Sequence, residues 1–203
     1  MSRRRILAVT LLAVTGIAAT SVADMPLRLL WNVTTSAPIG LYTVEPADRL
    51  AVPELVAILL PEPLAGFMVE RGYVGRGVPL LKRVIGLPGQ RVCRTGRAVI
   101  VDGVEMGDAL DRDRIGRALP VWEGCRVVAD GQLFLMNIDA RDSLDGRYFG
   151  PIPARAVIGR ALPLWTDEEG DGRFPHRRER CPPMAFPTPP HGESHAANRS
   201  IPS

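Results

Sequence analysis

One lysine stands out among the residues that could do chemistry. The chain of 203 residues carries 25 Lys and Arg residues, and Lys82 is the single lysine among them. It lies in the apolar run Leu-Leu-Lys-Arg-Val-Ile-Gly-Leu-Pro-Gly over 80–89. A buried lysine amine can lose its proton, whereas a guanidinium cannot. Lys82 is therefore a candidate general base, and a chance lysine at a strand edge is the plainer alternative.

The histidines leave little competition for that role. All 3 of them, His176, His191 and His195, lie close to the C-terminus. A Ser-His-Asp triad or a His-ligated metal in the preceding residues is therefore excluded by composition. Carboxylates, tyrosines, cysteines and Lys82 are the remaining acid–base candidates there. We expect no metal and no cofactor.

A lysine base needs a nucleophile, and serines are scarce. Between residues 24 and 166 the sequence contains only Ser36 and Ser143. Ser36 comes just before the first predicted strand, in a loop-like stretch where a hydroxyl can be presented to a substrate. The alternative is an ordinary Ser-Pro-type surface turn. Ser36 and Ser143 are thus the two serines that could work with Lys82.

The N-terminal residues have the character of an export segment. A basic stretch over 1–5 precedes an apolar run over 6–23, whose length of about 18 residues is at the short edge for a membrane span. The small residues Ser-Val-Ala over 21–23 could instead form a cleavage site, so an anchor and a cleavable signal both stay open, with the anchor slightly favoured. Either way the arginines stay inside and the rest is exported. We expect a domain that faces the periplasm at the inner membrane, or a periplasmic one after cleavage.

Residues 24–166 have a β-rich pattern. Short apolar runs and two Asp-Gly turns predict strands and hairpins, whereas the glycine-rich stretch 63–77 predicts a loop. Regular turn signals between short strands favour a mainly β, antiparallel domain of barrel-like or sandwich form. The predicted strands are 41–44, 55–60 and 156–159, with hairpins over 99–104 and 127–135.

The remaining composition limits partners and covalent links. Cys93 and Cys125 lie beside valines in strand-like runs and could pair in an oxidising compartment, or could be two small buried hydrophobes. Residues 167–203 are rich in Pro, Arg and His without a hydrophobic period, which predicts a disordered tail. The net charge is +3 and aromatic residues make up 5%, so nothing suggests nucleic-acid binding.

Three sequence blocks, in order, resemble the signal peptidase I superfamily of serine–lysine peptidases. They are the serine loop around Ser36, the block Lys-Arg-Val-Ile-Gly-Leu-Pro-Gly over 82–89, and the block Asp-Ser-Leu-Asp-Gly-Arg-Tyr-Phe-Gly over 142–150. The resemblance spans most of residues 6–160. It implies that family's coiled, barrel-like β domain behind an N-terminal hydrophobic helix.

The resemblance also implies a role for each matching residue. Ser36 would be the nucleophile and Lys82 the general base, and Ser143 would orient the lysine amine. Asp145 and Arg147 would form an ion pair that braces the site. Thr34 would join the Ser36 backbone N–H in the oxyanion hole.

The serine loop departs from the usual signal peptidase pattern, which has Met after the nucleophile. The stretch Ser-Ala-Pro-Ile-Gly-Leu-Tyr over 36–42 is similar to the TraF branch, the conjugative-transfer peptidases that mature a pilin subunit in type IV secretion. This implies a pilin-like precursor as substrate, conjugative transfer machinery as partner, and a maturation that can include cyclisation of the pilin. A general signal peptidase is one alternative. A non-catalytic exported component of a secretion machine is another, from a different class.

Overall fold

The computed structural model describes residues 3–22 and 27–174. Most of the described chain beyond residue 27 forms short strands. In chain order the elements are α1 (Arg3–Val22), β1 (Leu29–Asn32), β2 (Ile39–Glu45), β3 (Leu55–Ile58), α2 (Leu64–Glu70), β4 (Leu80–Gly86), β5 (Arg91–Thr95), β6 (Ala98–Val101), β7 (Val104–Asp108), β8 (Gly124–Val127), β9 (Gln132–Leu135), α3 (Gly146–Phe149), β10 (Ile152–Pro153), the 3₁₀ turn η1 (Ala154–Ala156) and β11 (Val157–Asp167).

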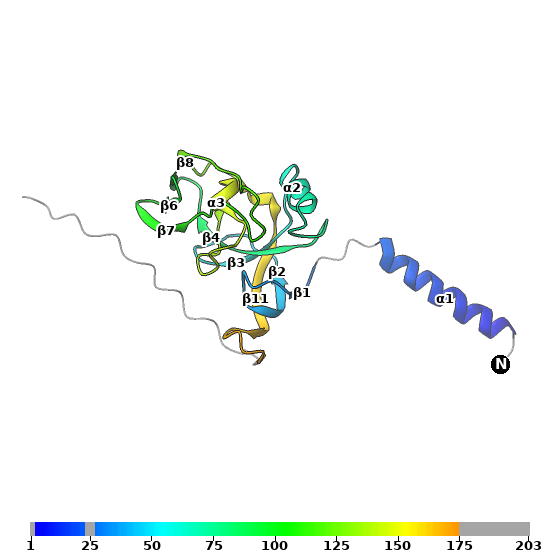
Figure 1. Ribbon diagram of the computed structural model, residues 1–203. Helices are drawn as coiled ribbons and strands as arrows, with labels where there is room; N and C mark the ends of the chain where they lie inside the picture. Colours follow the sequence, from blue (N-terminus) through cyan, green and yellow to red (C-terminus); the bar gives the residue numbers. More distant parts are fainter. Residues whose placement is uncertain (1–2, 23–26, 175–203) are drawn as a thin grey trace, which may run out of the picture.

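The strands form two antiparallel sheets. The larger has 7 strands in the order β1-β2-β11-β3-β4-β9-β10, and the smaller has 4 in the order β7-β6-β5-β8. In Figure 1, β6, β7 and β8 lie toward one end of the domain, and β1, β2 and β11 lie toward the other. The mainly β, antiparallel prediction is confirmed. Among the described strands, β1 and β10 are the two edges of the large sheet and do not pair with each other, so the barrel-like form is not a closed barrel.

The two Asp-Gly turns have different outcomes. Asp102 and Gly103 both have positive φ, of 47° and 84°, and they join β6 to β7 as the predicted hairpin. The hairpin predicted over 127–135 is wrong, because β8 pairs with β5 in the small sheet and β9 pairs with β4 in the large one. Val128 explains the difference: its buried side chain packs between the sheets, so the chain crosses from one sheet to the other at this point.

The stretch 63–77 is also more ordered than predicted. It contains the helix α2, which begins after Pro63 and buries Met68. Phe67 of this helix contacts Phe149 of α3, with ring centroids 5.8 Å apart. The glycines that suggested a loop mostly follow the helix, where Gly72 and Gly77 have positive φ.

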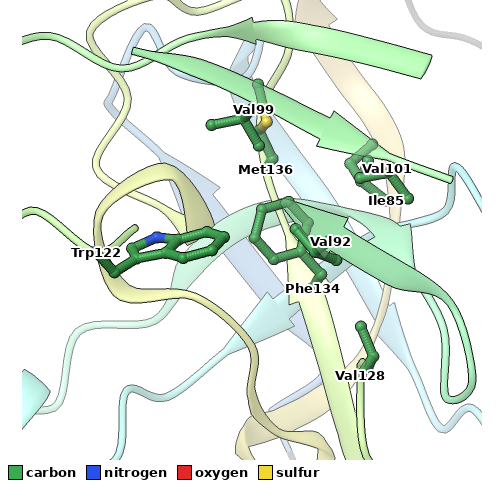
Figure 2. Packing of buried hydrophobic residues seen from close by; sticks show 8 residues of the cluster. All are labelled: Ile85, Val92, Val99, Val101, Trp122, Val128, Phe134 and Met136. Atoms are coloured by element: carbon green, nitrogen blue, oxygen red, sulfur yellow. The ribbon is translucent and has the colours of Figure 1, made fainter. Parts of the chain in front are cut away.

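A buried apolar cluster joins the two sheets. Ile85 of β4 and Phe134 of β9 come from the large sheet, and they meet Val92 of β5 and Val99 of β6 from the small sheet (Figure 2). Burying such side chains stabilises a fold by roughly 1.5–3 kcal/mol each. This cluster therefore fixes β4 and β9 relative to the small sheet.

The strand β4 is central to the packing of the large sheet. It pairs with β3 on one side and with β9 on the other. Its residues enter three separate clusters: Leu81 packs with Tyr42 and Ala57, Val84 packs with Val56 and Leu135, and Ile85 packs between the sheets. The strand that carries Lys82 is thus held from several sides.

The two ends of the chain are only partly described. The helix α1 covers most of the segment predicted to be an anchor or a signal. None of the described helices combines the length and the apolar character needed to cross a membrane. Whether the segment is an anchor or a cleavable signal stays a prediction. The predicted tail over 167–203 lies mostly outside the described residues, which end at 174.

Candidate active site

Lys82 lies in the middle of β4, with its side chain almost entirely out of solvent. It pairs with Val56 of β3 and is 4% exposed. Its Nζ donates a hydrogen bond of 2.6 Å to Ser143 Oγ. The amine is therefore buried inside the domain, with Ser143 as its hydrogen-bond partner.

Burial changes the acid–base properties of this amine. Desolvation lowers the pKa of Lys82 from 10.5 to about 8, with Asp145 raising it, Arg147 lowering it and Asp142 raising it by smaller amounts. The charged form is disfavoured in a low-dielectric site because it loses its hydration. A substantial fraction of the amine is therefore neutral at a mildly alkaline pH, where an ordinary lysine is almost fully protonated.

Ser36 lies on the turn between β1 and β2. These strands pair as a hairpin in which Asn32 lies opposite Gly40. Gly40 has a φ of +143°, and a Cβ there would lie 2.2 Å from the Trp165 carbonyl oxygen, so β11 packs closely against this point only because residue 40 is glycine. Ser36 itself is half-buried.

A buried asparagine shapes the Ser36 loop. The two hydrogens of the Asn32 amide Nδ2 are shared among the carbonyl oxygens of Thr34, Ala37 and Pro38, at 2.8, 3.0 and 3.0 Å. Its Oδ1 accepts from the Thr34 backbone N–H at 3.1 Å and from Thr34 Oγ1 at 2.9 Å. One carboxamide therefore fixes both sides of Ser36. Asn32 was absent from the predicted site residues, although asparagine two residues before a loop N–H is a known turn signal.

The hydroxyls of Thr34 and Ser36 lie 3.3 Å apart. Thr34 Oγ1 has one proton, and Asn32 Oδ1 accepts it. The Ser36 hydroxyl is therefore the donor in its contact with Thr34. An oxyanion role for Thr34 would require its hydroxyl to turn away from Asn32.

One cleft brings these groups together. Its volume is about 610 Å³, and Thr34, Ser36, Lys82 and Ser143 all line it. Lys82 Nζ is hydrogen-bonded to Ser143 Oγ, and Ser36 Oγ is hydrogen-bonded to Thr34 Oγ1. In the described structure no hydrogen bond joins Ser36 directly to Lys82. Apolar side chains form part of the cleft wall, among them Met68, Leu80, Leu110, Leu119 and Leu144. Charged side chains also line the cleft, namely Arg71, Asp113, Arg114, Arg117 and Asp142.

Asp145 and Arg147 form a buried ion pair next to this cleft. Arg147 donates to both carboxylate oxygens of Asp145 at 3.0 Å. The exposed fraction of the side chain is 1% for Arg147 and 0% for Asp145. Arg147 also donates to the backbone carbonyls of Asn137, Ala140 and Arg141. The pair therefore holds the loop that carries Ser143.

Asn137 is a second residue that the sequence did not suggest. Its side chain accepts from the Arg83 N–H at 3.1 Å and donates to the Leu81 carbonyl at 3.0 Å, on either side of Lys82. It lies six residues before Ser143, outside the block of residues that carried the family resemblance. Only its contacts make it noticeable.

The two cysteines lie away from the cleft. Cys93 of β5 and Cys125 of β8 are directly opposite in the small sheet and form a disulfide, with Cα atoms 4.0 Å apart. Neither lines the cleft. Among residues 3–22 and 27–174 no cluster of His, Cys, Asp and Glu could hold a metal ion.

A second hollow, of about 490 Å³, lies elsewhere on the domain. Its lining includes Ala47, Leu87, Leu133 and Gly159, and it contains none of the predicted site residues.

The domain is mainly antiparallel β and has a buried lysine and two serines in one cleft. Sequence comparison identifies its family. The sequence model of the family described as signal peptidase, peptidase S26, matches residues 2–165. The chain belongs to this family, whose members are peptidases.

The individual relatives come from two groups. A conjugal transfer protein TraF of Agrobacterium fabrum strain C58 is 39% identical over 146 residues, which are 66% of this chain and 81% of that protein. A plasmid transfer protein TraF of Escherichia coli is 30% identical over 147 residues, again 66% of this chain and 81% of that protein. A probable signal peptidase I-1 of Synechocystis is 32% identical over 131 residues, 60% of this chain and 64% of that protein.

One solved structure is also similar. A signal peptidase I of Enterococcus faecalis V583 aligns with 56% of this chain and 98% of its own chain, at 20% sequence identity and a TM-score of 0.33.

Proposed function

We propose that this protein is a serine endopeptidase with a Ser-Lys dyad that processes an exported precursor. The observation that carries the proposal is the buried Lys82 amine, which lies in the same cleft as Ser36 and is hydrogen-bonded to Ser143. A lysine works as a base only when its amine is neutral, and burial lowers its pKa to about 8. The peptidase family of the chain supports the same conclusion.

The proposed reaction begins at Ser36. Its hydroxyl turns from Thr34 toward Lys82, which takes the proton as Ser36 Oγ attacks the scissile carbonyl. The protonated Lys82 then gives that proton to the leaving amine, and an acyl-enzyme remains on Ser36. Water attacks the ester with Lys82 again as base, which releases the new carboxylate and restores the serine. For a cyclised product, an amine of the substrate would attack in place of water.

Other residues support these steps. Ser143 orients the amine through its hydrogen bond, and the Asp145–Arg147 ion pair braces the loop of Ser143. The Ser36 backbone N–H and the Thr34 hydroxyl would form the oxyanion hole, with Thr34 leaving Asn32 as negative charge develops. Losing one such donor typically costs about 2.7–4 kcal/mol of transition-state stabilisation.

We further propose that the substrate is the pilin subunit of a conjugative type IV secretion system. Two of the relatives described above are named for conjugal or plasmid transfer. The stretch 36–42 around the serine resembles the TraF branch as well. We propose that the enzyme acts at the inner membrane, with its catalytic domain facing the periplasm and the transfer machinery nearby. Maturation by cyclisation would be part of this role.

A general signal peptidase is the second candidate. The similarity to the Synechocystis protein, a probable signal peptidase I-1, favours it. The two candidates share Ser36 and Lys82 and differ only in substrate. A panel containing a pilin-like precursor and an unrelated secretory precursor would separate them, because a general signal peptidase should cleave both.

The decisive experiment co-expresses the full chain with a pilin-like precursor and follows the product by mass spectrometry. The Ser36→Ala variant should leave the precursor uncut, whereas the neighbouring Thr35→Ala should process it, because Thr35 lines the same cleft without a proposed chemical role. A cyclic product would be lighter than the linear one by one water. Processing by a folded Ser36→Ala protein would contradict the peptidase proposal and favour a non-catalytic component of the secretion machine.

A further inference from the structure

We propose that Asn137 is a positioning residue for Lys82: its carboxamide holds the β4 backbone on both sides of the lysine and so determines where the amine lies. The inference rests on the proposed function only in giving Lys82 a catalytic role. Asn137 itself does not line the cleft, so it would act through Lys82 and not on the substrate.

The reason begins with the end of β9. This strand pairs with β4 up to Leu135, and the Met136 N–H still donates to the Arg83 carbonyl at 2.9 Å. Beyond Met136, no backbone group in the described structure continues the hydrogen bonding between β9 and β4. The side chain of Asn137 takes its place, accepting from the Arg83 N–H at 3.1 Å and donating to the Leu81 carbonyl at 3.0 Å.

These two backbone groups need such a partner. Along a strand, the carbonyl of residue 81 and the N–H of residue 83 point to the same side. The backbone N–H and carbonyl of Lys82, between them, point to the other side, toward β3. Backbone groups in a folded interior are almost always paired, because leaving them without a hydrogen bond is costly. Asn137, itself 4% exposed, is the group that satisfies both.

The same residue connects β4 to the bracing ion pair. The Asn137 N–H donates to Asp145 Oδ2 at 3.1 Å, and Arg147 Nη2 donates to the Asn137 carbonyl at 2.6 Å. Its side chain therefore holds the strand of Lys82, while its backbone is held by the ion pair that organises the loop of Ser143. The 2.6 Å hydrogen bond between Lys82 and Ser143 joins strand β4 to the loop of Ser143. Because Asn137 connects the same two segments, we expect the geometry of this hydrogen bond to depend on it.

The chemistry of the contact explains why an asparagine is suitable. The β4 backbone presents one donor and one acceptor, and a carboxamide offers the complementary acceptor and donor on one short, planar group. An aspartate would keep the acceptor, but its second oxygen would face the Leu81 carbonyl. An alanine would leave both backbone groups without a partner.

The experiment uses the fact that Lys82 is the single lysine of the chain. Full-length protein labelled with ¹³C-lysine gives one lysine side-chain signal, whose titration reports the amine directly and without a substrate. The wild-type midpoint is expected near pH 8, in line with the lowered pKa of Lys82. In Asn137→Ala, the loosened strand should admit water and move the midpoint upward, while the charged groups around the amine, Asp142, Asp145 and Arg147, stay the same.

A matched control separates this effect from general loss of packing. Val99 is buried between the sheets and does not line the cleft, so Val99→Ala should lower the melting temperature and leave the lysine midpoint unchanged. Where a precursor is cleaved, Asn137→Ala should lower kcat on the order of 100-fold, as small misplacements of a catalytic group can, with KM little changed. A folded Asn137→Ala protein with the wild-type midpoint would overturn the inference.

A second measurement covers the case in which Asn137→Ala does not fold. In the wild-type protein the Arg83 amide should exchange with solvent as slowly as the Val84 amide, which donates to the Glu54 carbonyl at 2.9 Å. Exchange of the Arg83 amide at the rate of an unprotected amide would contradict its hydrogen bond to the Asn137 side chain. These readouts need no activity, so an inactive wild-type enzyme would refute the proposed function and leave the Asn137 inference to be judged on its own result.

Discussion

Lys82 Nζ and Ser143 Oγ are 2.6 Å apart, and this contact distinguishes Ser143 from Ser36, the other serine in the cleft. Ser143 is buried against the amine, whereas Ser36 is half-buried on a loop that opens to the cleft. A residue that orients a base should be enclosed with it, and a nucleophile must be reachable by a substrate. The positions of Ser143 and Ser36 fit these two requirements.

Replacing Lys82 with arginine should abolish cleavage. Arginine keeps the positive charge but cannot lose its proton, so it cannot act as a base. Precursor processing should fall to the level of Ser36→Ala, as measured by mass spectrometry of the product. The neighbouring Arg83→Lys is the matched control and should remain active, because Arg83 does not line the cleft. An active Lys82→Arg enzyme would remove Lys82 from the mechanism.

Activity should rise with pH through the pKa of Lys82, at about 8. The neutral amine is the active form, so kcat/KM measured between pH 6 and 10 should climb and then level off. Asp145 raises this pKa, so Asp145→Asn should move the rise to lower pH if the variant stays folded. A pH-independent wild-type rate would argue against a titrating amine.

The same lowered pKa predicts how stability depends on pH. In the unfolded chain the lysine titrates near 10.5, and in the folded protein near 8, so between these values the unfolded state binds more protons and stability rises with pH. Lys82→Met lacks this group and lacks the cost of burying its charge at neutral pH. Its free energy of unfolding relative to wild type should therefore fall by about 2–3 kcal/mol from pH 7 to pH 10.

Urea unfolding at several pH values measures this difference. All other groups titrate in both proteins, so they cancel in the comparison. A constant gap between Lys82→Met and wild type would show that the amine is not desolvated in the folded protein. Val99→Ala should show such a constant gap, because it removes no titratable group.

Removing one partner of the buried Asp145–Arg147 ion pair should cost more stability than removing both. Arg147→Met leaves a buried carboxylate without its partner, which typically costs roughly 3–5 kcal/mol. The double variant Asp145→Asn, Arg147→Met removes both charges and should recover part of that loss. Unfolding curves of the two single variants and the double variant give the coupling. Additive effects would show that the pair does not act as a unit.

Removing the Asn32 side chain should disturb the loop of Ser36. Asn32→Ala loses hydrogen bonds on both sides of the serine, and a destabilisation of about 1–3 kcal/mol is expected from the groups left unpaired. The effect on kcat should be larger than that of Thr35→Ala, which makes no such contacts. Cleavage rates at a temperature where both variants are folded provide the comparison. Equal rates would mean that Asn32 supports the fold and not the geometry of Ser36.

Local patterns explain what could be predicted from the sequence. Alternation and turn residues indicated an antiparallel β domain, and the Asp102-Gly103 turn forms its hairpin because both residues adopt positive φ within the turn itself. The second Asp-Gly pair also lies in a turn, but this turn joins strands of different sheets and makes no hairpin, because Val128 is buried between the sheets by residues distant in sequence. The helix α2 was missed because glycines nearby resemble a loop, and its contact with Phe149 is equally distant in sequence.

The sequence by itself determined which residues could do the chemistry. A single lysine, no histidine between residues 24 and 166, and two serines there make Lys82, Ser36 and Ser143 candidates, because composition excludes a histidine base in that region. Only the tertiary structure decided which of them meet. Lys82 and Ser143 are 61 residues apart in sequence, and the packing of β4 and the 137–147 loop brings them together. The same packing buries the amine and lowers its pKa, and it assigns Asn32 and Asn137 their contacts, because desolvation and hydrogen bonding depend on neighbours that a linear pattern does not specify.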